Sequence, residues 1–177
     1  MSETSKKHKA EAPSKLKYAV IVCSTSRYEQ LRLGGDVEDP SGDLIEDLVI
    51  GHGHEVSFRK IVPDKPEKIR EAVEEALSSR EVDVILTCGG TGITSSDVTI
   101  ETVKPMLDKT LEGFGEIFRL ISYRKIGSAA ILTRSIAGAS RGKAVFCIPG
   151  SPDAVRTALE ELILKEAGHI VKHAREK

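Results

Sequence analysis

The sequence has few of the residues on which several classes of function depend. It contains no tryptophan and only 4% aromatic residues, so stacking platforms for single-stranded nucleic acid are hard to build. Its formal net charge of -1 indicates no strongly basic surface for nucleic acid. No apolar run approaches the roughly 18 residues that span a bilayer, and no apolar segment of the signal-peptide kind begins the chain. We therefore expect a soluble, cytoplasmic protein that binds neither nucleic acid nor membrane.

Cysteine and amide side chains are also scarce. The three cysteines, Cys23, Cys88 and Cys147, stand singly without metal-ligand spacing, which favours buried free thiols over redox or metal roles. Asparagine is absent and Gln30 is the only glutamine, whereas Glu and Lys are plentiful, a bias found in proteins from hot environments. Hydrophobic residues make up 40% of the chain and charged residues 30%, which indicates a folded domain rather than a disordered chain.

The length of 177 residues is typical of a single domain with one core. Residues 1–17 lack apolar periodicity and are expected to form a flexible N-terminal tail. In residues 18–177, short apolar runs alternate with segments of helical periodicity, which predicts one α/β domain. We expect a single doubly wound, mostly parallel sheet with helices on both faces. The expected strands are residues 18–23, 55–62, 82–87, 129–133 and 144–148. The expected helices are a capped segment from Ser41 to about Gly51, residues 66–77, 98–107 and 116–123, and a last helix that starts at Ser151.

The segment after the third expected strand is the most unusual one. In open α/β sheets, ligands bind beyond the carboxyl ends of the strands, and here that position holds Gly89-Gly90-Thr91-Gly92. Glycines let the backbone turn so that N–H groups point at an anion, and Thr91 and Thr94 can add hydroxyl donors. The spacing fits neither the dinucleotide fingerprint nor the P-loop. The loop by itself predicts either a phosphate site or a plain tight turn.

Two aspartates lie where they can face the same crevice. Asp97 is either the N-cap of the next helix or a carboxylate that holds Mg²⁺ against a phosphate. Glu101, one helical turn later, either assists Asp97 or is a solvated helix residue. Asp64 lies between two prolines after the second expected strand, where it either forms a turn or faces the crevice. Local sequence leaves each of these alternatives open.

Polar residues also follow the first and last expected strands. The hydroxyls of Ser24 and Ser26 either donate to ligand oxygens or satisfy backbone groups at the strand end. Pro149-Gly150-Ser151-Pro152 leads into Asp153 and forms a favourable helix start, whose N–H groups can also bind an anion. The remaining basic side chains are expected at the surface rather than at a metal or phosphate site: His52, His54, His169, His173, Arg119, Arg124, Arg134 and Arg141.

Four motifs follow one another along the chain. They are Thr87–Thr99, which contains the glycine loop and Asp97, then Gly113-Phe114-Gly115-Glu116, Ser135-Ile136-Ala137-Gly138 and Pro149-Gly150-Ser151-Pro152. Each motif alone is common. Their order and spacing together resemble the MoaB/MogA family of molybdenum-cofactor biosynthesis, and the resemblance covers essentially residues 18–172.

The resemblance implies a doubly wound α/β domain that binds molybdopterin and assembles as a homotrimer or homohexamer. In the active branch, which is similar to the gephyrin and plant G domains, ATP and Mg²⁺ are used to adenylylate the terminal phosphate of molybdopterin. That phosphate attacks the α-phosphate of ATP in line, and pyrophosphate leaves. The product is then handed over to the enzyme that inserts molybdate or tungstate. Insertion itself belongs to larger multidomain relatives, for whose additional domains this chain has no room.

The resemblance also assigns roles to individual residues. It implies catalytic or metal-binding roles for Asp97, as the Mg²⁺ ligand, and for Asp64. Because Asp64 is retained, an active adenylyltransferase is favoured over the alternative, a non-catalytic molybdopterin-binding protein. Many relatives have Ser-x-Ser-Asp after the first strand, whereas Arg27 stands at the last of these positions here and becomes a candidate phosphate contact. The residues implied to assist at the site are Glu101, Glu116, Ser135 and Gly138.

Overall fold

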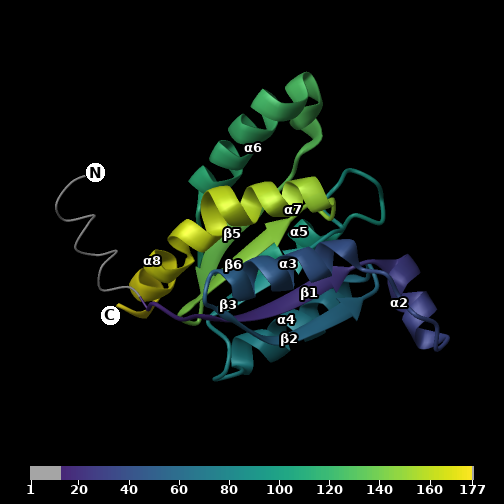
Figure 1. The fold of residues 1–177 in the computed structure, drawn as a ribbon, viewed down its shortest axis with the longest axis horizontal. Helices are drawn as coiled ribbons and strands as arrows, with labels where there is room; N and C mark the ends of the chain where they lie inside the picture. Colours follow the sequence, from purple (N-terminus) through teal and green to yellow (C-terminus); the bar gives the residue numbers. More distant parts are fainter. Residues whose placement is uncertain (1–12, 177) are drawn as a thin grey trace.

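A six-stranded sheet with the order β2-β1-β3-β6-β5-β4 forms the centre of residues 13–176, the part of the chain that the computed structural model describes (Figure 1). Two short strands at one edge are antiparallel to their neighbours: β5 (Ile136–Ser140) and β4 (Lys109–Thr110). The other four run parallel: β1 (Lys17–Cys23), β2 (Glu55–Val62), β3 (Val84–Cys88) and β6 (Lys143–Ile148). The mostly parallel sheet predicted from the sequence is therefore confirmed.

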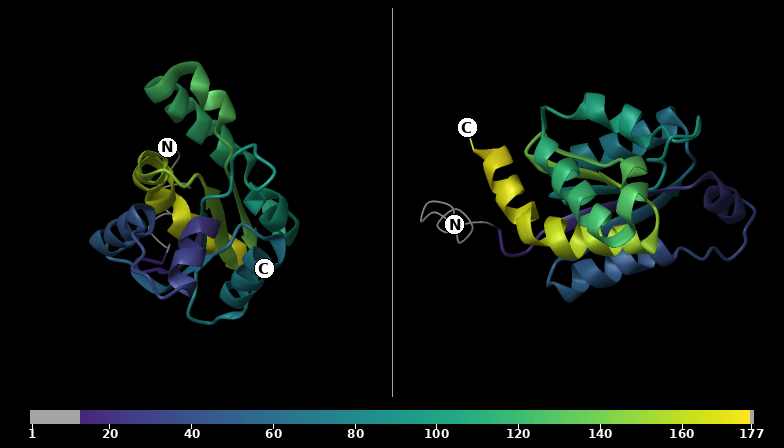
Figure 2. Two further views of the ribbon diagram at one scale, coloured as in Figure 1. Left: turned by 90° about the vertical axis from the view of Figure 1, so that its right-hand side faces the viewer. Right: turned by 90° about the horizontal axis from the view of Figure 1, so that it is seen from above.

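Helices cover both faces of the sheet, as predicted. Residues of β1 point alternately to the two faces, so that Val20 and Val22 belong to one hydrophobic cluster and Ala19 and Ile21 to the other. Figure 2 shows the helices of the two faces on opposite sides of the sheet. The first face is covered by α3 (Pro40–Gly51), α7 (Pro152–Ala158) and α8 (Leu164–Arg175), and the second by α4 (Pro66–Ser78) and α5 (Thr99–Val103).

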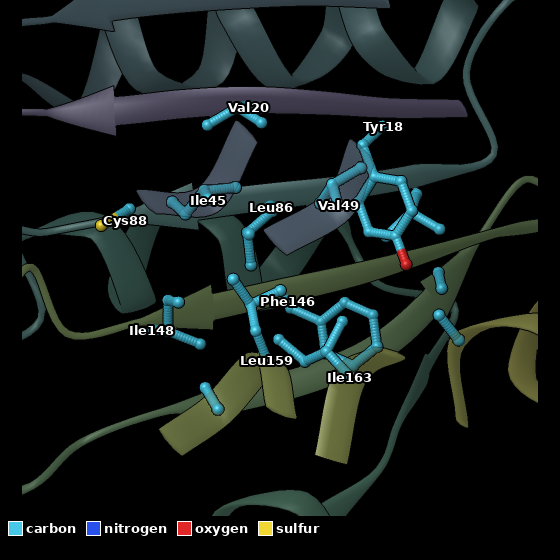
Figure 3. Packing of buried hydrophobic residues seen from close by; sticks show 14 of the residues in the cluster. Tyr18, Val20, Ile45, Val49, Leu86, Cys88, Phe146, Ile148, Leu159 and Ile163 are labelled. Carbon is cyan, nitrogen blue, oxygen red and sulfur yellow. The ribbon is translucent and has the colours of Figure 1, made fainter. Parts of the chain in front are cut away.

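Buried apolar side chains hold the first face together. Figure 3 shows Ile45 and Val49 of α3 packed over the strands, with Leu159 and Ile163 on the far side of Phe146. All of these side chains are buried, and burial of each contributes roughly 1.5–3 kcal/mol relative to an exposed position. Leu159 and Ile163 belong to η3 (Leu159–Ile163), a π-helical turn that joins α7 to α8. The sheet and its covering helices thus form a rigid base for the loops that follow the strands.

The structure differs from the prediction at two helices, α2 (Thr25–Arg32) and α3. α3 is capped by Asp39, whose carboxylate accepts from the Gly42 N–H at 3.1 Å, and not by Ser41. The hydroxyl of Ser41 instead donates to the Gly150 carbonyl at 2.7 Å. A helix that lacks an apolar stripe, α2 (Thr25–Arg32), begins directly after β1 and was not predicted. Its amphipathic signal is absent because none of its residues is buried.

The expected strand at residues 129–133 is wrong. This stretch belongs to η2 (Gly127–Leu132), a 3₁₀ helix in which Ile131 is 83% exposed, and the strand is β5, seven residues later. β5 consists mainly of small residues and shows no apolar run in the sequence. Gly138 is required in it because a Cβ atom there would lie 2.3 Å from the Lys109 carbonyl oxygen of β4.

A helical arm, residues 112–132, projects from the edge of the sheet (Figure 1). It consists of α6 (Glu112–Ile126), which is longer than the predicted helix at residues 116–123, and η2. At its base, Phe114 stacks on Phe118 with ring centroids 6.1 Å apart. The ring centroid of Phe114 also lies 5.4 Å from that of Phe146 in β6. Farther out, large apolar side chains are exposed: Ile117, Leu120, Tyr123, Ile126, Ile131 and Leu132.

The domain begins slightly earlier than predicted. Leu16 is only 1% exposed and Lys17 is the first residue of β1, so both belong to the folded domain rather than to the expected tail at residues 1–17. Most of that expected tail lies outside the described residues. Within residues 13–176, no helix is long and apolar enough to cross a membrane.

The three cysteines are buried free thiols, as predicted. Burial raises the pKa of each thiol to about 12, so the thiolate form is scarce near neutral pH.

Candidate functional site

Two cavities lie next to each other beyond the carboxyl ends of β1, β3 and β6. The arm pocket, of about 390 Å³, is bounded by the glycine loop, the start of α7 and the helical arm. The α2 pocket, of about 200 Å³, is bounded by the glycine loop, the start of α2 and Asp64. Four residues line both cavities and therefore form their common wall: Gly89, Gly90, Asp97 and Gly150.

Backbone packed against backbone builds this wall. Gly89 and Gly90 have φ angles of +99° and +62°, a region that L side chains rarely adopt. A Cβ atom on Gly89 would lie 2.4 Å from the Cys23 carbonyl oxygen, and one on Gly150 would lie 3.1 Å from Gly89 Cα. The loops after β1, β3 and β6 approach so closely that side chains are excluded between them. Thr91 and Gly92 continue the wall into the arm pocket.

Asp97 lies at the border between the two pockets. Its Oδ2 accepts from the Thr94 N–H at 2.9 Å and from the Thr94 hydroxyl at 2.6 Å. The N-cap interpretation is wrong, because Val98 is the N-cap of α5. Hydrogen bonding from Thr94, supported by Gly92 N–H and the charge of Arg134, lowers the pKa of Asp97. A negative charge is thereby fixed at the common wall.

Asp64 faces the same wall from the end of β2. Its Oδ2 accepts from both the N–H and the hydroxyl of Thr25, each at 2.8 Å, and its own N–H donates to that hydroxyl at 2.9 Å. Its Oδ1 lies beside Gly90, where an added Cβ atom would be 2.9 Å away. Asp64 and Asp97 both line the α2 pocket, so the structure brings the two predicted acids together.

Ser24, Ser26 and Arg27, which follow β1, also line the α2 pocket. Ser24 is the N-cap of α2, and its Oγ accepts from the Arg27 N–H at 3.4 Å and lies 3.3 Å from Ser26 Oγ. Arg27 Nε donates to the Glu38 carbonyl at 3.0 Å and lies 3.8 Å from the buried carboxylate of Asp39. These contacts hold the guanidinium group at the pocket.

The start of α7 lines the arm pocket together with Pro149, Gly150 and Asp153. Ser151 is the N-cap, and its Oγ accepts from the Ala154 N–H at 3.3 Å. The predicted helix start is therefore present. It points its first turn at the cavity that the glycine loop also borders.

Two cations of the arm pocket were not expected at this site from the sequence. Lys125 of α6 donates to the Thr157 hydroxyl at 2.7 Å, and that hydroxyl donates to the Asp153 carbonyl at 2.8 Å. Within residues 13–176, no carboxylate lies within ion-pair distance of Lys125. Arg134, which follows the arm, lines the same cavity and pairs with Glu101 at 2.5 Å. No local signal marked Lys125, because only the folding-back of the arm brings it to the crevice.

The predicted assisting residues lie mostly outside the crevice. Glu101 reaches it only through Arg134. Ser135 lines a separate cavity of about 230 Å³ with Arg119 and Arg134, and its buried hydroxyl has no hydrogen-bond partner within residues 13–176. Glu116 is exposed on α6 and borders neither pocket of the crevice. Gly138 serves the pairing of β4 with β5, as described above.

A metal ion at the crevice would need oxygen atoms from a bound phosphate in addition to those of the protein. Within the described part of the chain, no group of three or more His, Cys, Asp and Glu side chains is arranged to hold a metal ion. Asp97 and Asp64 nevertheless each present one carboxylate, and neither pocket of the crevice is lined by a histidine. Two carboxylates suit a hard cation that is shared with phosphate oxygens.

The fold and crevice define an α/β protein with a two-part crevice beyond the carboxyl edge of a mostly parallel sheet. The chain belongs to the MoaB/MogA family: residues 19–169 match the family described as a probable molybdopterin binding domain. The resemblance noted in the sequence is thus confirmed over nearly the same span.

Individual relatives are similar along almost their whole length. The chain is 46% identical to the molybdopterin adenylyltransferase of Pyrococcus furiosus, over 96% of this chain and 97% of that protein. It is also 46% identical to the molybdenum cofactor biosynthesis protein B of Bacillus cereus, over 92% and 93% of the two chains. The crystal structure of the tungsten cofactor synthesizing protein MoaB from Pyrococcus furiosus matches with a TM-score of 0.82 at 45% identity, covering 93% of this chain and all of that one.

Proposed function

We propose that this protein adenylylates molybdopterin: the terminal phosphate of molybdopterin attacks the α-phosphate of ATP, and pyrophosphate leaves. The observation that carries the proposal is the common wall of the two pockets, at which Asp97 lies. A transfer between two substrates needs two adjoining sites whose reacting groups meet at one border. The similarity to the Pyrococcus furiosus adenylyltransferase gives further support.

The chemistry of this transfer suits the side chains of the crevice. A phosphate nucleophile is already anionic, so no strong general base is needed, in keeping with pockets that no histidine lines. Catalysis then rests on holding the phosphates in line and on neutralising the charge that builds up. Lys125, Arg134 and Arg27 supply positive charge at the two pockets, and the glycine loop forms the wall between them.

Mg²⁺ fits the two aspartates. Thr25 engages one oxygen of Asp64, and Thr94 engages one oxygen of Asp97, so each carboxylate keeps its second oxygen for another partner. Mg²⁺ prefers one or two protein carboxylates together with phosphate oxygens and water. When bound there, Mg²⁺ would neutralise charge on the reacting phosphates. The chain's own contribution is to fix the orientation of both carboxylates.

We also infer that copies of the chain assemble through the helical arm into a homotrimer or homohexamer. The exposed apolar side chains of the arm form a surface of the kind that marks protein interfaces. Leu120, Tyr123 and Ile131 line a shallow cavity between α6 and η2. Light scattering after size-exclusion chromatography tests this: replacing Tyr123 and Ile131 with Glu should yield monomers, and an unchanged mass would contradict the inferred interface.

Family membership also supports a proposal about where the protein acts and what takes up its product. We propose that the protein acts in the cytoplasm and hands adenylylated molybdopterin to the enzyme that inserts molybdate or tungstate. The alternative, a protein that binds molybdopterin without transferring AMP, predicts molybdopterin binding but no chemistry.

An assay with molybdopterin, Mg²⁺ and ATP labelled at the α-phosphate separates the two proposals. The transferase should form labelled adenylyl-molybdopterin and pyrophosphate in equal amounts, and omission of molybdopterin should abolish both. If the protein binds molybdopterin but forms neither product, the adenylyltransferase proposal is wrong. A matched assay of the Asp97→Asn protein shows whether the turnover arises at the crevice.

A further inference from the structure

Two histidines of α8 face each other one helical turn apart. The Nε2 atoms of His169 and His173 are 2.9 Å apart, and the ring centroids are separated by 4.6 Å with the planes tilted by 56°. Both were predicted to lie at the surface rather than at a metal site. Their side chains are indeed partly exposed, and each imidazole also has a glutamate at its other nitrogen.

The glutamates determine which ring nitrogens carry hydrogen. Glu166 Oε2 lies 3.3 Å from His169 Nδ1, and Glu176 Oε2 lies 2.7 Å from His173 Nδ1. A carboxylate accepts hydrogen bonds, so each Nδ1 carries the hydrogen and donates it. In a neutral imidazole, the Nε2 atom then has a lone pair. Two such lone pairs converge over the 2.9 Å gap and repel each other unless a positive charge lies between them.

We propose that His169 and His173 form a binding site for Cu²⁺ or Ni²⁺. Metal–nitrogen bonds of about 2.0–2.1 Å that meet at a right angle place two nitrogens about 2.9 Å apart, whereas a tetrahedral angle places them about 3.3 Å apart. The observed 2.9 Å corresponds to neighbouring positions of square-planar or octahedral geometry. This geometry favours Cu²⁺ and Ni²⁺ over tetrahedral Zn²⁺.

The surroundings of the pair support ligation. Glutamates that accept from the Nδ1–H of ligating imidazoles fix the ring orientation and raise the basicity of the ligand nitrogen. The side chains of His169 and His173 are 26% and 45% exposed, so an ion can enter from solvent and complete its coordination with water. Glu166, His169 and His173 recur at spacings of three and four along α8 and therefore share one helix face. Glu176 follows three positions later as the C-cap residue of the helix.

This site is separate from the crevice. α8 ends where Arg175 donates to the Gly142 carbonyl at 3.1 Å and pairs with Asp83 at 2.5 Å, next to the amino ends of β3 and β6. The crevice lies beyond the carboxyl ends of the same strands, and Figure 1 shows α8 and α2 at opposite ends of the molecule. Metal binding on α8 is thus a second property, independent of the proposed adenylyl transfer.

Calorimetric titration of the EDTA-treated, desalted full chain with CuCl₂, NiCl₂ and ZnCl₂ tests the site. We expect one ion per chain at this site, bound in the order Cu²⁺, Ni²⁺, Zn²⁺, with nitrogen hyperfine structure in the Cu²⁺ EPR spectrum. His169→Gln and His173→Gln should each weaken Cu²⁺ binding at least tenfold, and Glu176→Gln should weaken it by about 10-fold to 100-fold.

Matched controls keep the test decisive. His52→Gln removes a histidine whose Nδ1 contacts the Leu48 carbonyl at the end of α3, and it should leave binding unchanged. His8→Gln reports on chelation by the N-terminal residues. The proposal is overturned if saturable binding is absent, or if binding is lost in His8→Gln and retained in His169→Gln and His173→Gln. Circular dichroism of each variant confirms that the fold is intact.

Discussion

Thr25 donates its N–H and its hydroxyl to the same oxygen of the Asp64 carboxylate, each at 2.8 Å. The two residues are 39 positions apart in the sequence and follow neighbouring strands of the sheet. Their pairing ties the start of α2 to the end of β2. It also fixes the second oxygen of Asp64 beside Gly90, at the wall between the two pockets.

This pairing makes Thr25 a positioning residue for Asp64. Thr25→Val keeps the shape of the side chain but removes the hydroxyl, so Asp64 loses one of its two donors from Thr25. We expect kcat for adenylyl transfer to fall about tenfold with a smaller change in KM, since misplacement rather than lost substrate contact is the cause. Initial rates measure this. Thr25→Ser retains the hydroxyl and should keep most of the activity; equal losses in both variants would contradict the positioning role.

The carboxylate of Asp97 should make the acid limb of the pH–rate profile depend on Thr94. Hydrogen bonding from Thr94 lowers the pKa of Asp97 below its ordinary value of 3.8, so the charged form persists as the pH falls until that lowered pKa is reached. Thr94→Val removes the hydroxyl donor, which raises the pKa and moves the loss of activity to higher pH. Rates between about pH 2.5 and pH 6 measure the shift, since this range includes the ordinary value of 3.8 and the lower pH at which the wild type should lose activity.

Asp97→Asn provides the reference for this experiment. It should abolish turnover without unfolding the protein, because a neutral amide keeps the size of the side chain but cannot supply the charge. Wild-type rates in Asp97→Asn would exclude the catalytic role. A profile in which Thr94→Val and wild type lose activity at the same pH would show that another group sets the acid limb.

Lys125 should contribute to binding of the anionic substrate in the arm pocket. Its ammonium group is held by the Thr157 hydroxyl at 2.7 Å and has no carboxylate partner within residues 13–176, so it is available to a phosphate. Lys125→Met should raise the KM of that substrate about tenfold, and the difference from wild type should shrink as salt is added. Steady-state kinetics at two ionic strengths measure both effects. The control is Arg124→Met, which removes a neighbouring exposed charge that lines neither pocket of the crevice. An equal rise in KM for this variant would mean that the net charge of the arm, and not a contact from Lys125, binds the substrate.

Lys143 should be important for stability rather than for activity. Its buried ammonium group donates to the carbonyls of Ala76 at 3.1 Å and Val82 at 2.8 Å, and also to that of Ser79. Burial lowers the pKa of Lys143, and these hydrogen bonds offset the cost of placing a charge there. Lys143→Met leaves the carbonyls without this donor and should lower the free energy of unfolding by roughly 2–4 kcal/mol. Urea denaturation measures the change, with exposed Lys109→Met as the control; a similar value for both variants would contradict the prediction.

The central strands were predictable because burial on both faces leaves a continuous apolar run in the sequence. Strand β5 was not, since its small residues are selected by pairing with β4 and β6 rather than by burial of large side chains. The reverse error occurred at Ile131 and Leu132. Their apolar character reflects an exposed surface on the arm, which periodicity cannot distinguish from a core strand.

The crevice was partly predictable for a similar reason. Topology places the loops after parallel strands at one edge of the sheet, so the glycine loop, Asp64 and Ser151 could be grouped without coordinates. Lys125 could not, because it is 32 residues from Thr157 and meets it only through the path of the arm. The capping role expected of Asp97 failed for a local reason: its carboxylate closes a turn on Thr94 before α5 begins at Thr99.

The backbone contacts around Gly89 restrict how this crevice can change in evolution. A side chain at Gly89 requires movement of the Cys23 carbonyl at the end of β1, and one at Gly150 requires the backbone at Gly89 to shift, so substitutions at either position are costly. The exposed parts of α2 and of the arm have no such constraint. Sequence drift should therefore accumulate on the outer walls of the two pockets, while their shared wall stays fixed. Changes in substrate preference among descendants of this protein would then arise from the arm and α2, and engineered libraries are best directed to the same two segments.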